Sequence, residues 1–522
     1  MLHNQTDRHR LLSLALLVLA ECTSSLSWAQ KPIPPSKPAA PLSTAKAQLD
    51  RGDLDSVEST LWSVLGSDPN NEQALIMLGV VRGRQQRYAE AEALFRRVLQ
   101  VNPKSIVASR NLAGALLAQD KPEDAIRQYN QAIQLNPRDS DLKIEVAKLE
   151  LARGNFGEAL ASLNTIKADR LPALAVPVKA ASLLGVGRRA DAEALIPLVK
   201  ASPAAALDLA HVFVEAKDAD AALKTLSSLN SIPKPLEGQA LYVKGRALAQ
   251  KGNSTAALKS LRQALAADPK SVETLLALAE MFAAENKHSD SVTMLQKARE
   301  LNPDSREVLR HFIVEAMHAG QNDRALLAAQ DLQRKSSELD DRFLVASVMI
   351  QQKQFLPASH VLEDYVEQRP EDAKAYLGLG IAYLNLLRYP EAKRSLERSL
   401  QMNPNIAETE FQLGLLASQD GNRQQAIQHW RRTVELQPQH AKALFSLGTV
   451  YLESGELTEA ESAFSRSLAA DPGNMKAEYN LALVLNKSGK TEEAKQHFDH
   501  YKKMQEEEHT TSGNSPRVSD HQ

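Results

Sequence analysis

The chain has 522 residues, of which 43% are apolar and 24% charged, a balance that is ordinary for a soluble folded protein. Aromatic residues make up only 5%, and alanine and leucine are abundant, which favours closely packed helices over a β-rich fold. The formal net charge of -2 argues against a nucleic-acid-binding protein, since neutralising phosphates requires a surplus of Lys and Arg.

The first 29 residues have the pattern of a secretory signal peptide. Arg8 and Arg10 precede the apolar run 11–20, and small residues surround a cleavage point after Ala29. The run is too short to span a membrane, so we expect an exported chain, periplasmic or secreted, without a transmembrane segment after cleavage. Cys22, the only cysteine, lies within this segment. It gives lipoprotein anchoring as an alternative, although Glu21 occupies a position where that motif has a small residue. Residues 30–41 are rich in proline and predict an extended linker.

A period of 34 residues runs through the rest of the chain. Prolines recur at this spacing within three groups: Pro69, Pro103 and Pro137; Pro269 and Pro303; and Pro370, Pro404, Pro438 and Pro472. Asn or Asp precedes most of them. Such a pair cannot continue a helix, because the proline ring restricts its predecessor and lacks an N–H. Each pair therefore predicts the end of one helix and the entry to the next.

Fourteen repeat units follow from this period, and three of their positions have a distinctive composition. The eighth position is Gly or Ala in all but one unit, and the twentieth is Ala in twelve. Small residues there predict a close approach of two antiparallel helices. The fifteenth is Gly in eight units, where the first helix must end in a left-handed conformation.

This pattern resembles the tetratricopeptide-repeat (TPR) family over about residues 38–505. The resemblance implies an all-α superhelical solenoid of about fourteen helix-turn-helix repeats, placed at residues 42–505, in which the first helix of each pair lines a concave groove. Pro177 and Pro197 predict a local kink. Residues 506–522 are polar and predict a disordered tail.

No catalytic constellation is evident, so we expect neither an enzyme nor a bound cofactor. The sequence has no HExxH pair, phosphate-binding loop or nucleophile elbow. His311 and His318 lie seven residues apart on one first helix, but two histidines without a third ligand make a weak metal site. The prediction for metals is therefore none.

The predicted groove offers the main candidate binding residues. The fifth positions of the last five units are Phe343, Leu377, Phe411, Phe445 and Tyr479, and three of the last four units carry a lysine at the second position, namely Lys374, Lys442 and Lys476. An aromatic ladder beside lysines would suit an extended peptide with acidic groups. The alternative is that these rings only pack between adjacent units.

Two functions follow as expectations. The first is a protein-binding scaffold or adaptor of the cell envelope, with partners in an envelope-assembly, secretion or polysaccharide-export system. The second is a carbohydrate- or small-ligand-binding module, in which the rings stack on sugars and Gln412, Ser446 and Asn480 supply hydrogen bonds.

Overall fold

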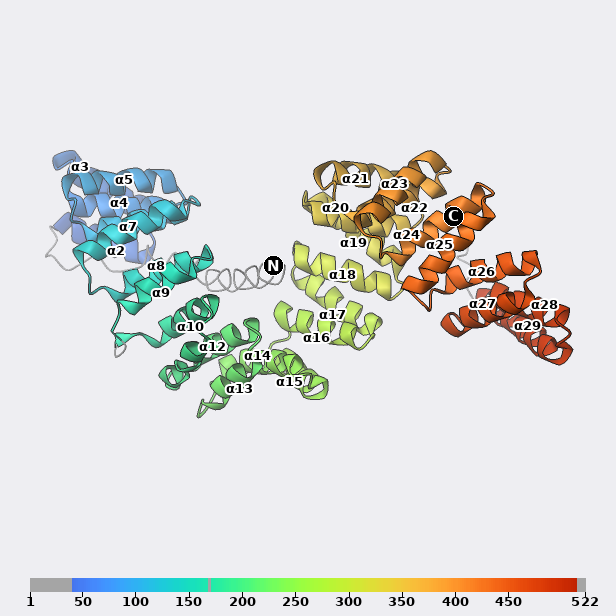
Figure 1. Ribbon diagram of the computed structural model, residues 1–522. Coiled ribbons are helices and arrows are strands. Elements are labelled where there is room, and N and C mark those ends of the chain that lie inside the picture. Colours follow the sequence, from blue (N-terminus) through green and yellow to red (C-terminus); the bar gives the residue numbers. More distant parts are fainter. Residues whose placement is uncertain (1–39, 168–169, 514–522) are drawn as a thin grey trace, which may run out of the picture. The chain divides into compact units, whose positions relative to one another are not determined.

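The computed structural model describes residues 40–167 and 170–513, and these residues form helices and turns (Figure 1). The predicted signal peptide, Cys22 and nearly all of the predicted linker lie outside the described residues. No helix within the described ranges is both long and apolar enough to cross a membrane.

The described helices follow one another as fourteen pairs, the number predicted from the period. The first seven pairs are α2 (Ala40–Arg51) and α3 (Leu54–Ser67), α4 (Glu72–Arg84) and α5 (Tyr88–Val101), α6 (Ile106–Leu117) and α7 (Pro122–Leu135), α8 (Ser140–Ala152) and α9 (Phe156–Asn164), α10 (Val176–Gly185) and α11 (Arg189–Glu193), α12 (Pro203–Glu215) and α13 (Ala219–Ser227), and α14 (Glu237–Gln250) and α15 (Ser254–Ala267). The other seven are α16 (Val272–Ala284) and α17 (His288–Leu301), α18 (Arg306–His318) and α19 (Asn322–Lys335), α20 (Leu339–Gln351) and α21 (Phe355–Gln368), α22 (Ala373–Asn385) and α23 (Tyr389–Met402), α24 (Ala407–Gln419) and α25 (Arg423–Leu436), α26 (Ala441–Ser454) and α27 (Leu457–Ala470), and α28 (Met475–Lys487) and α29 (Thr491–Gly513). Short 3-10 turns cover Ala173–Ala175, Ile196–Val199 and Lys234–Leu236.

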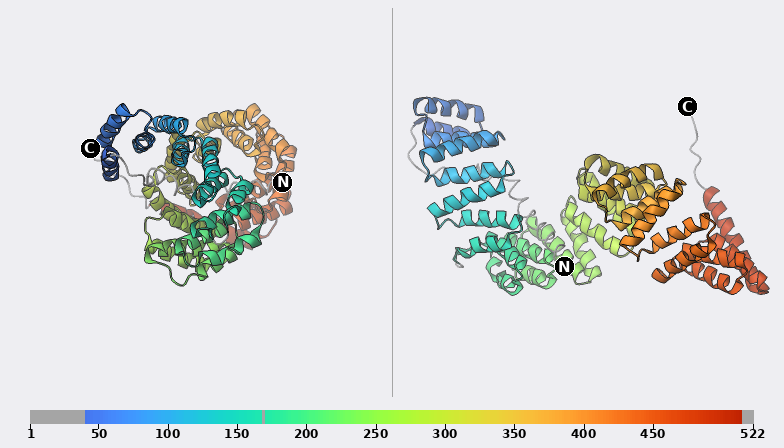
Figure 2. Two further views of the ribbon diagram at one scale, coloured as in Figure 1. Left: turned by 90° about the vertical axis from the view of Figure 1, so that its left-hand side faces the viewer. Right: turned by 45° about the horizontal axis from the view of Figure 1, so that its top comes forward.

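Packing divides the chain into two compact halves, an N-terminal half that ends at Met281 and a C-terminal half that begins at Phe282, so the division falls within α16. In each half, the two helices of most pairs pack together, and most second helices pack on the first helix of the next pair. The right-hand view of Figure 2 shows this layering for the N-terminal pairs, in blue and cyan.

The solenoid extends beyond both of its predicted borders. α2 begins at Ala40, inside the predicted linker, and α29 continues to Gly513, inside the predicted disordered tail. Residues 501–512 contain neither Pro nor Gly, and the Lys, Gln and Glu of 502–508 are good helix formers, so nothing in the sequence ends the helix at 505. Residues 514–522 lie outside the described part.

The Asx-Pro pairs end helices as predicted. Asn102, for example, is the C-cap of α5, and its backbone is extended there, with φ at -134°. Its side-chain oxygen also accepts a hydrogen bond from the N–H of Lys104 at 3.1 Å, closing an Asx turn. The same bond forms at Asp68, Asp268, Asn403 and Asp471. Asn or Asp therefore both ends the helix and shapes the turn.

The fifteenth position adopts the left-handed conformation in every pair. The eight glycines there have φ between +69° and +80°. In the remaining six pairs the same conformation is held by residues with a side chain, Gln86, Asp120, Lys217, Asn286, Lys353 and Leu387, with φ between +57° and +61°. Register therefore dictates this turn even where the residue type does not favour it.

At the five glycines that occupy it, the eighth position is small mainly because a side chain of the second helix, rather than its backbone, comes close. A Cβ added to Gly79 would lie 2.5 Å from the ring of Phe95, and one added to Gly414 would lie 2.3 Å from the indole nitrogen of Trp430. Both rings belong to the second helix of the same pair. The small residue makes room for a large buried side chain.

The predicted kink is found at Pro197. The second helix of that pair is reduced to the five-residue α11, followed by the 3-10 turn Ile196–Val199. Pro177 lies in the first turn of α10, where a missing N–H costs nothing.

Candidate functional site

In the C-terminal half, the first helices of most consecutive pairs contact one another. α18 contacts α20, α20 contacts α22, α22 contacts α24, and α26 contacts α28. Within the described residues of this half, consecutive second helices make at most sparse contacts. Because the first helices lie closer together than the second helices, this half of the solenoid curves toward the first helices, and these line its inner side. We call this surface the first-helix face; positions 2, 5 and 9 of each first helix share one side because they are three and four residues apart.

The predicted aromatic residues do not form a ladder of rings stacked on one another. Phe343 and Phe445 are half-buried and pack on the second helix of their own pair, with centroids 5.5 Å from Tyr365 and 5.8 Å from Phe464. Phe411 is only 5% exposed and lies 4.9 Å from the ring of His440, at the start of the next pair. These three rings are mainly packing groups, and only Phe343 and Phe445 are partly open to solvent.

Tyr479 is the aromatic residue of the predicted set that is open to solvent. It is 41% exposed, and its ring packs against Phe498 at 5.8 Å and Tyr501 at 5.3 Å, both on α29. α29 thus supports one side of the ring and leaves another side available. Asn480, its neighbour in the predicted set, is half-buried.

The three predicted lysines are exposed. Lys374, Lys442 and Lys476 begin α22, α26 and α28, and the structure gives their ammonium groups no ion pair with any described residue. Glu408 takes the same position in α24 and is bound by His440 at 3.2 Å and Gln412 at 2.7 Å. Burial raises the pKa of Glu408, but the hydrogen bonds from His440 and Gln412, together with the charges of His440 and Lys442, outweigh it and the pKa is lowered. A carboxylate therefore interrupts the row of cations.

Half-buried aliphatic side chains share the first-helix face with the lysines. They occupy the fifth, ninth and twelfth positions of successive first helices: Leu377, Ile381, Leu384, Leu415, Leu452 and Leu483. We call these six residues the apolar stripe. Apart from Leu377, these residues were not among the predicted binding residues, although the same period locates them. An apolar stripe with exposed cations at its edge can bind a polypeptide that carries apolar and acidic side chains.

A second group on first helices lies in the N-terminal half and was also missed. The ring centroids of His211 and Tyr242 are 6.2 Å apart. Arg246 donates to the Tyr242 hydroxyl at 3.3 Å, and a carboxylate oxygen of Glu215 lies 3.9 Å from the guanidinium of Arg246. The Nε2 atom of His211 is buried without a hydrogen bond. Burial lowers the pKa of His211 and raises that of Tyr242, so both are neutral near pH 7. These residues could have been found from the sequence, because His211, Tyr242 and Arg246 occupy fifth or ninth positions of their repeat units.

The C-terminal half also contains a shallow cavity of about 420 Å³ between α25, α26 and α27. Arg431, Arg466, Glu435 and Glu459 line it together with Tyr451. Arg431 donates to the Tyr451 hydroxyl at 3.0 Å, and Arg466 donates to the carbonyl of Pro438 at 3.2 Å. Both arginines already serve neighbouring turns and side chains, so this cavity gives a weaker case for a binding site than the first-helix face.

Comparison with known proteins agrees with the repeat architecture. Models described as tetratricopeptide repeat match residues 72–138, 116–175, 207–272, 242–306, 373–406, 411–475 and 451–508, together more than half of the chain. Over 290 residues the chain is 24% identical to "Cellulose synthase operon protein C" of Pseudomonas fluorescens (strain SBW25), a match that covers 50% of this chain and 20% of that protein. The chain thus spans about a fifth of that relative's length.

Two solved structures are similar at low sequence identity. A tetratricopeptide repeat protein from Parabacteroides merdae is 16% identical with a TM-score of 0.44, covering 48% of this chain and 99% of that one. The APC/C hetero-tetramer Cut9-Hcn1 is 16% identical with a TM-score of 0.41, covering 84% of this chain and 95% of that one. One matched segment, 373–406, begins with α22 and ends in the turn after α23, so the family's repeat coincides with the helix pair seen here. The protein belongs to the tetratricopeptide-repeat family.

Proposed function

We propose that the protein is a non-catalytic scaffold or adaptor that binds other proteins on the first-helix face of its C-terminal half. TPR membership supports the general role, since the repeat is a protein-interaction fold. The observation that carries the location is the apolar stripe, which lies beside Lys374, Lys442 and Lys476 on consecutive first helices. The partner it fits is a segment with apolar side chains toward the stripe and carboxylates toward the lysines.

The apolar stripe and the lysines contribute to binding by different amounts. An exposed ion pair contributes about 0.2–1 kcal/mol, whereas covering apolar surface contributes about 25 cal/mol for each Å² removed from water. The stripe therefore supplies most of the affinity. The lysines orient the partner and accelerate its association, and salt weakens their contribution.

The location is tested by charge reversal. The variant Lys374→Glu/Lys442→Glu/Lys476→Glu changes exposed residues only, so the fold is retained. Lys297→Glu/Lys393→Glu/Lys495→Glu is the matched control, because these lysines are exposed on the second helices α17, α23 and α29. Pull-down from an envelope extract of the source organism should recover several-fold less partner with the first variant and an unchanged amount with the control. Equal recovery by both variants would contradict the proposed surface.

The site of action that we propose is the cell envelope. The signal-peptide pattern of residues 1–29 supports it, with lipid anchoring at Cys22 as the lesser alternative. The relative's name refers to a cellulose synthase operon, so among envelope systems we favour a polysaccharide-export assembly. Mass spectrometry of the protein from its source should find a mature chain that begins at Gln30. An intact N-terminus would exclude export by this route.

The carbohydrate-binding alternative receives less support from the geometry. Stacking on sugars needs open ring faces, and of the predicted rings Phe411 is buried while Phe343 and Phe445 pack on neighbouring rings. Gln412, one of the expected hydrogen-bonding residues, is also buried and donates to Glu408. Only Tyr479 among the described residues of that set keeps an exposed face.

A further inference from the structure

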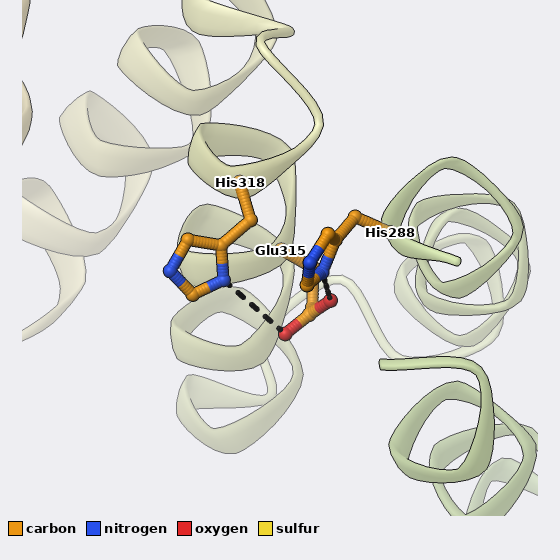
Figure 3. A group of neighbouring side chains, drawn as sticks. All are labelled: His288, Glu315 and His318. Carbon is orange, nitrogen blue, oxygen red and sulfur yellow. Dashed lines mark hydrogen bonds and ion pairs between the residues drawn. The ribbon is translucent and has the colours of Figure 1, made fainter. Parts of the chain in front are cut away.

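Two histidines and one glutamate meet where α17 and α18 adjoin, within the C-terminal half (Figure 3). His288 is the first residue of α17, and Glu315 and His318 lie in the last turn of α18. The sequence had paired His318 with His311. The structure instead places His318 beside His288, with ring centroids 4.9 Å apart, and His311 is not part of the cluster.

The carboxylate of Glu315 lies between the two imidazoles. Its Oε2 atom is 2.9 Å from Nδ1 of His288, and its Oε1 atom is 3.9 Å from Nδ1 of His318. One ligand atom from each residue lies within 4.8 Å of the other two. Figure 3 shows both rings directed toward the carboxylate, from two different helices.

We propose that His288, Glu315 and His318 form a binding site for Zn²⁺ that connects two adjacent repeats. Two neutral imidazoles and one carboxylate are a donor set that suits zinc, and zinc sites with three protein ligands leave the fourth position to water. Glu315 and His318 are three residues apart, so they extend from the same side of α18. The same Glu-x-x-His spacing positions metal ligands on the helices of carboxylate-bridged bundles.

The geometry requires only small side-chain movements. Bonds of about 2.05 Å in a tetrahedral arrangement put ligand atoms about 3.3 Å apart. The separations of 2.9 and 3.9 Å run to different oxygens of Glu315, and one ligand atom from each of the three residues lies within 4.8 Å of the other two, so the side chains need to close by about an ångström around one ion. Zinc would replace the hydrogen bond between His288 and Glu315, with the imidazole proton held on Nε2.

Burial and local charge are also compatible with a cation. The side chains of His288 and Glu315 are 25% and 12% exposed, so two ligands are held by packing, while His318 is 57% exposed and leaves a path for the ion. His318 ends α18, where the helix dipole favours positive charge; the start of α17 has the opposite effect on His288. Lys287, the nearest cation in sequence, is paired with Glu285 at 2.8 Å.

The proposal is tested on the full chain without an affinity tag, after treatment with a chelator. Titration calorimetry with zinc chloride should find one site in the wild type. His288→Ala, Glu315→Gln and His318→Ala should each weaken it at least tenfold, since loss of even an outer-shell partner costs 10–100-fold. His311→Ala, an exposed histidine on the same helix outside the cluster, should leave it unchanged.

A second readout identifies the ligands. Cobalt chloride should give the visible absorption of tetrahedral Co²⁺ in the wild type and in His311→Ala, but not in His288→Ala, and melting curves without metal check that each variant is folded. Failure of the wild type to bind zinc would overturn the proposal. Zinc that stays bound in both His288→Ala and His318→Ala belongs to other histidines and would overturn it as well.

Discussion

Replacing Gly414 by alanine should destabilise the repeat formed by α24 and α25. The new Cβ would lie 2.3 Å from Nε1, 2.5 Å from Cδ1 and 3.0 Å from Cε2 of Trp430. Carbon atoms in ordinary contact are about 3.5–4.0 Å apart, so the indole must retreat by roughly 1 Å. Trp430 is 3% exposed, and the surrounding core leaves it little space for that movement.

Two opposing effects set the size of the loss. Overpacking a filled core costs about 1–3 kcal/mol, and three ring atoms at or below 3.0 Å put this substitution near the upper value. Alanine in a helix interior returns about 1 kcal/mol relative to glycine. The expected net change is therefore a loss of about 2 kcal/mol in the free energy of unfolding.

Trp430 itself reports the result. The chain has three tryptophans, so Trp28→Phe and Trp62→Phe leave one fluorophore. With a denaturant slope of about 2 kcal/mol/M, the urea midpoint of its emission change should fall by roughly 1 M. An unchanged or higher midpoint would refute the proposed contact. Gly157→Ala is the matched control: this glycine is exposed in α9 with nothing within 4 Å of its added Cβ, so the same substitution should not lower the stability of the chain.

Two further predictions concern turn strain and acid stability. Leu387→Gly should stabilise its repeat by about 0.5–1 kcal/mol. Leu387 is 70% exposed at φ +60°, a left-handed conformation that costs a residue with a side chain about 1–2 kcal/mol, and glycine offsets part of this gain because it loses more backbone entropy on folding. A lower urea midpoint for the variant would contradict this prediction. Hydrogen bonds from Arg82 hold the pKa of Glu58 at about 2, below the ordinary 4.5. This pair therefore stabilises the folded state fully above pH 4.5 and loses its contribution as the pH falls toward 2. Over that range, the free energy of unfolding of the wild type should fall by about 1–2 kcal/mol more than that of Glu58→Gln. Denaturation followed by circular dichroism at each pH measures both, and parallel pH profiles of the two proteins would contradict a stabilising role of the Glu58–Arg82 pair.

Local chemistry made the solenoid predictable from sequence. The Asx-Pro pairs, the left-handed fifteenth position and the small eighth position each depend on atoms within one repeat. Leu387 shows the strength of the register, since it adopts the turn without being glycine. The predicted end of the solenoid at residue 505 was wrong, because the polar residues after it were interpreted as disordered although they are good helix formers.

The binding residues were harder to predict because their environment comes from neighbouring repeats. Phe411 and Tyr479 occupy the same position of their units, yet His440 of the next repeat packs against Phe411, whereas Tyr479 stays exposed beside α29. His288 and Glu315 likewise meet across a repeat boundary, 27 residues apart in the chain. A comparison within single helices found only His311 and His318.

Site-specific photo-crosslinking tests the central claim, protein binding on the first-helix face, most directly. A photoreactive phenylalanine would replace Leu377 or Tyr479 on this face, and Leu356, exposed on the second helix α21, as the control. We predict that positions 377 and 479 crosslink to the same partner protein, that excess unlabelled protein suppresses these products, and that position 356 gives none. Crosslinks to that partner from position 356 alone would contradict the account and move the binding surface to the second helices.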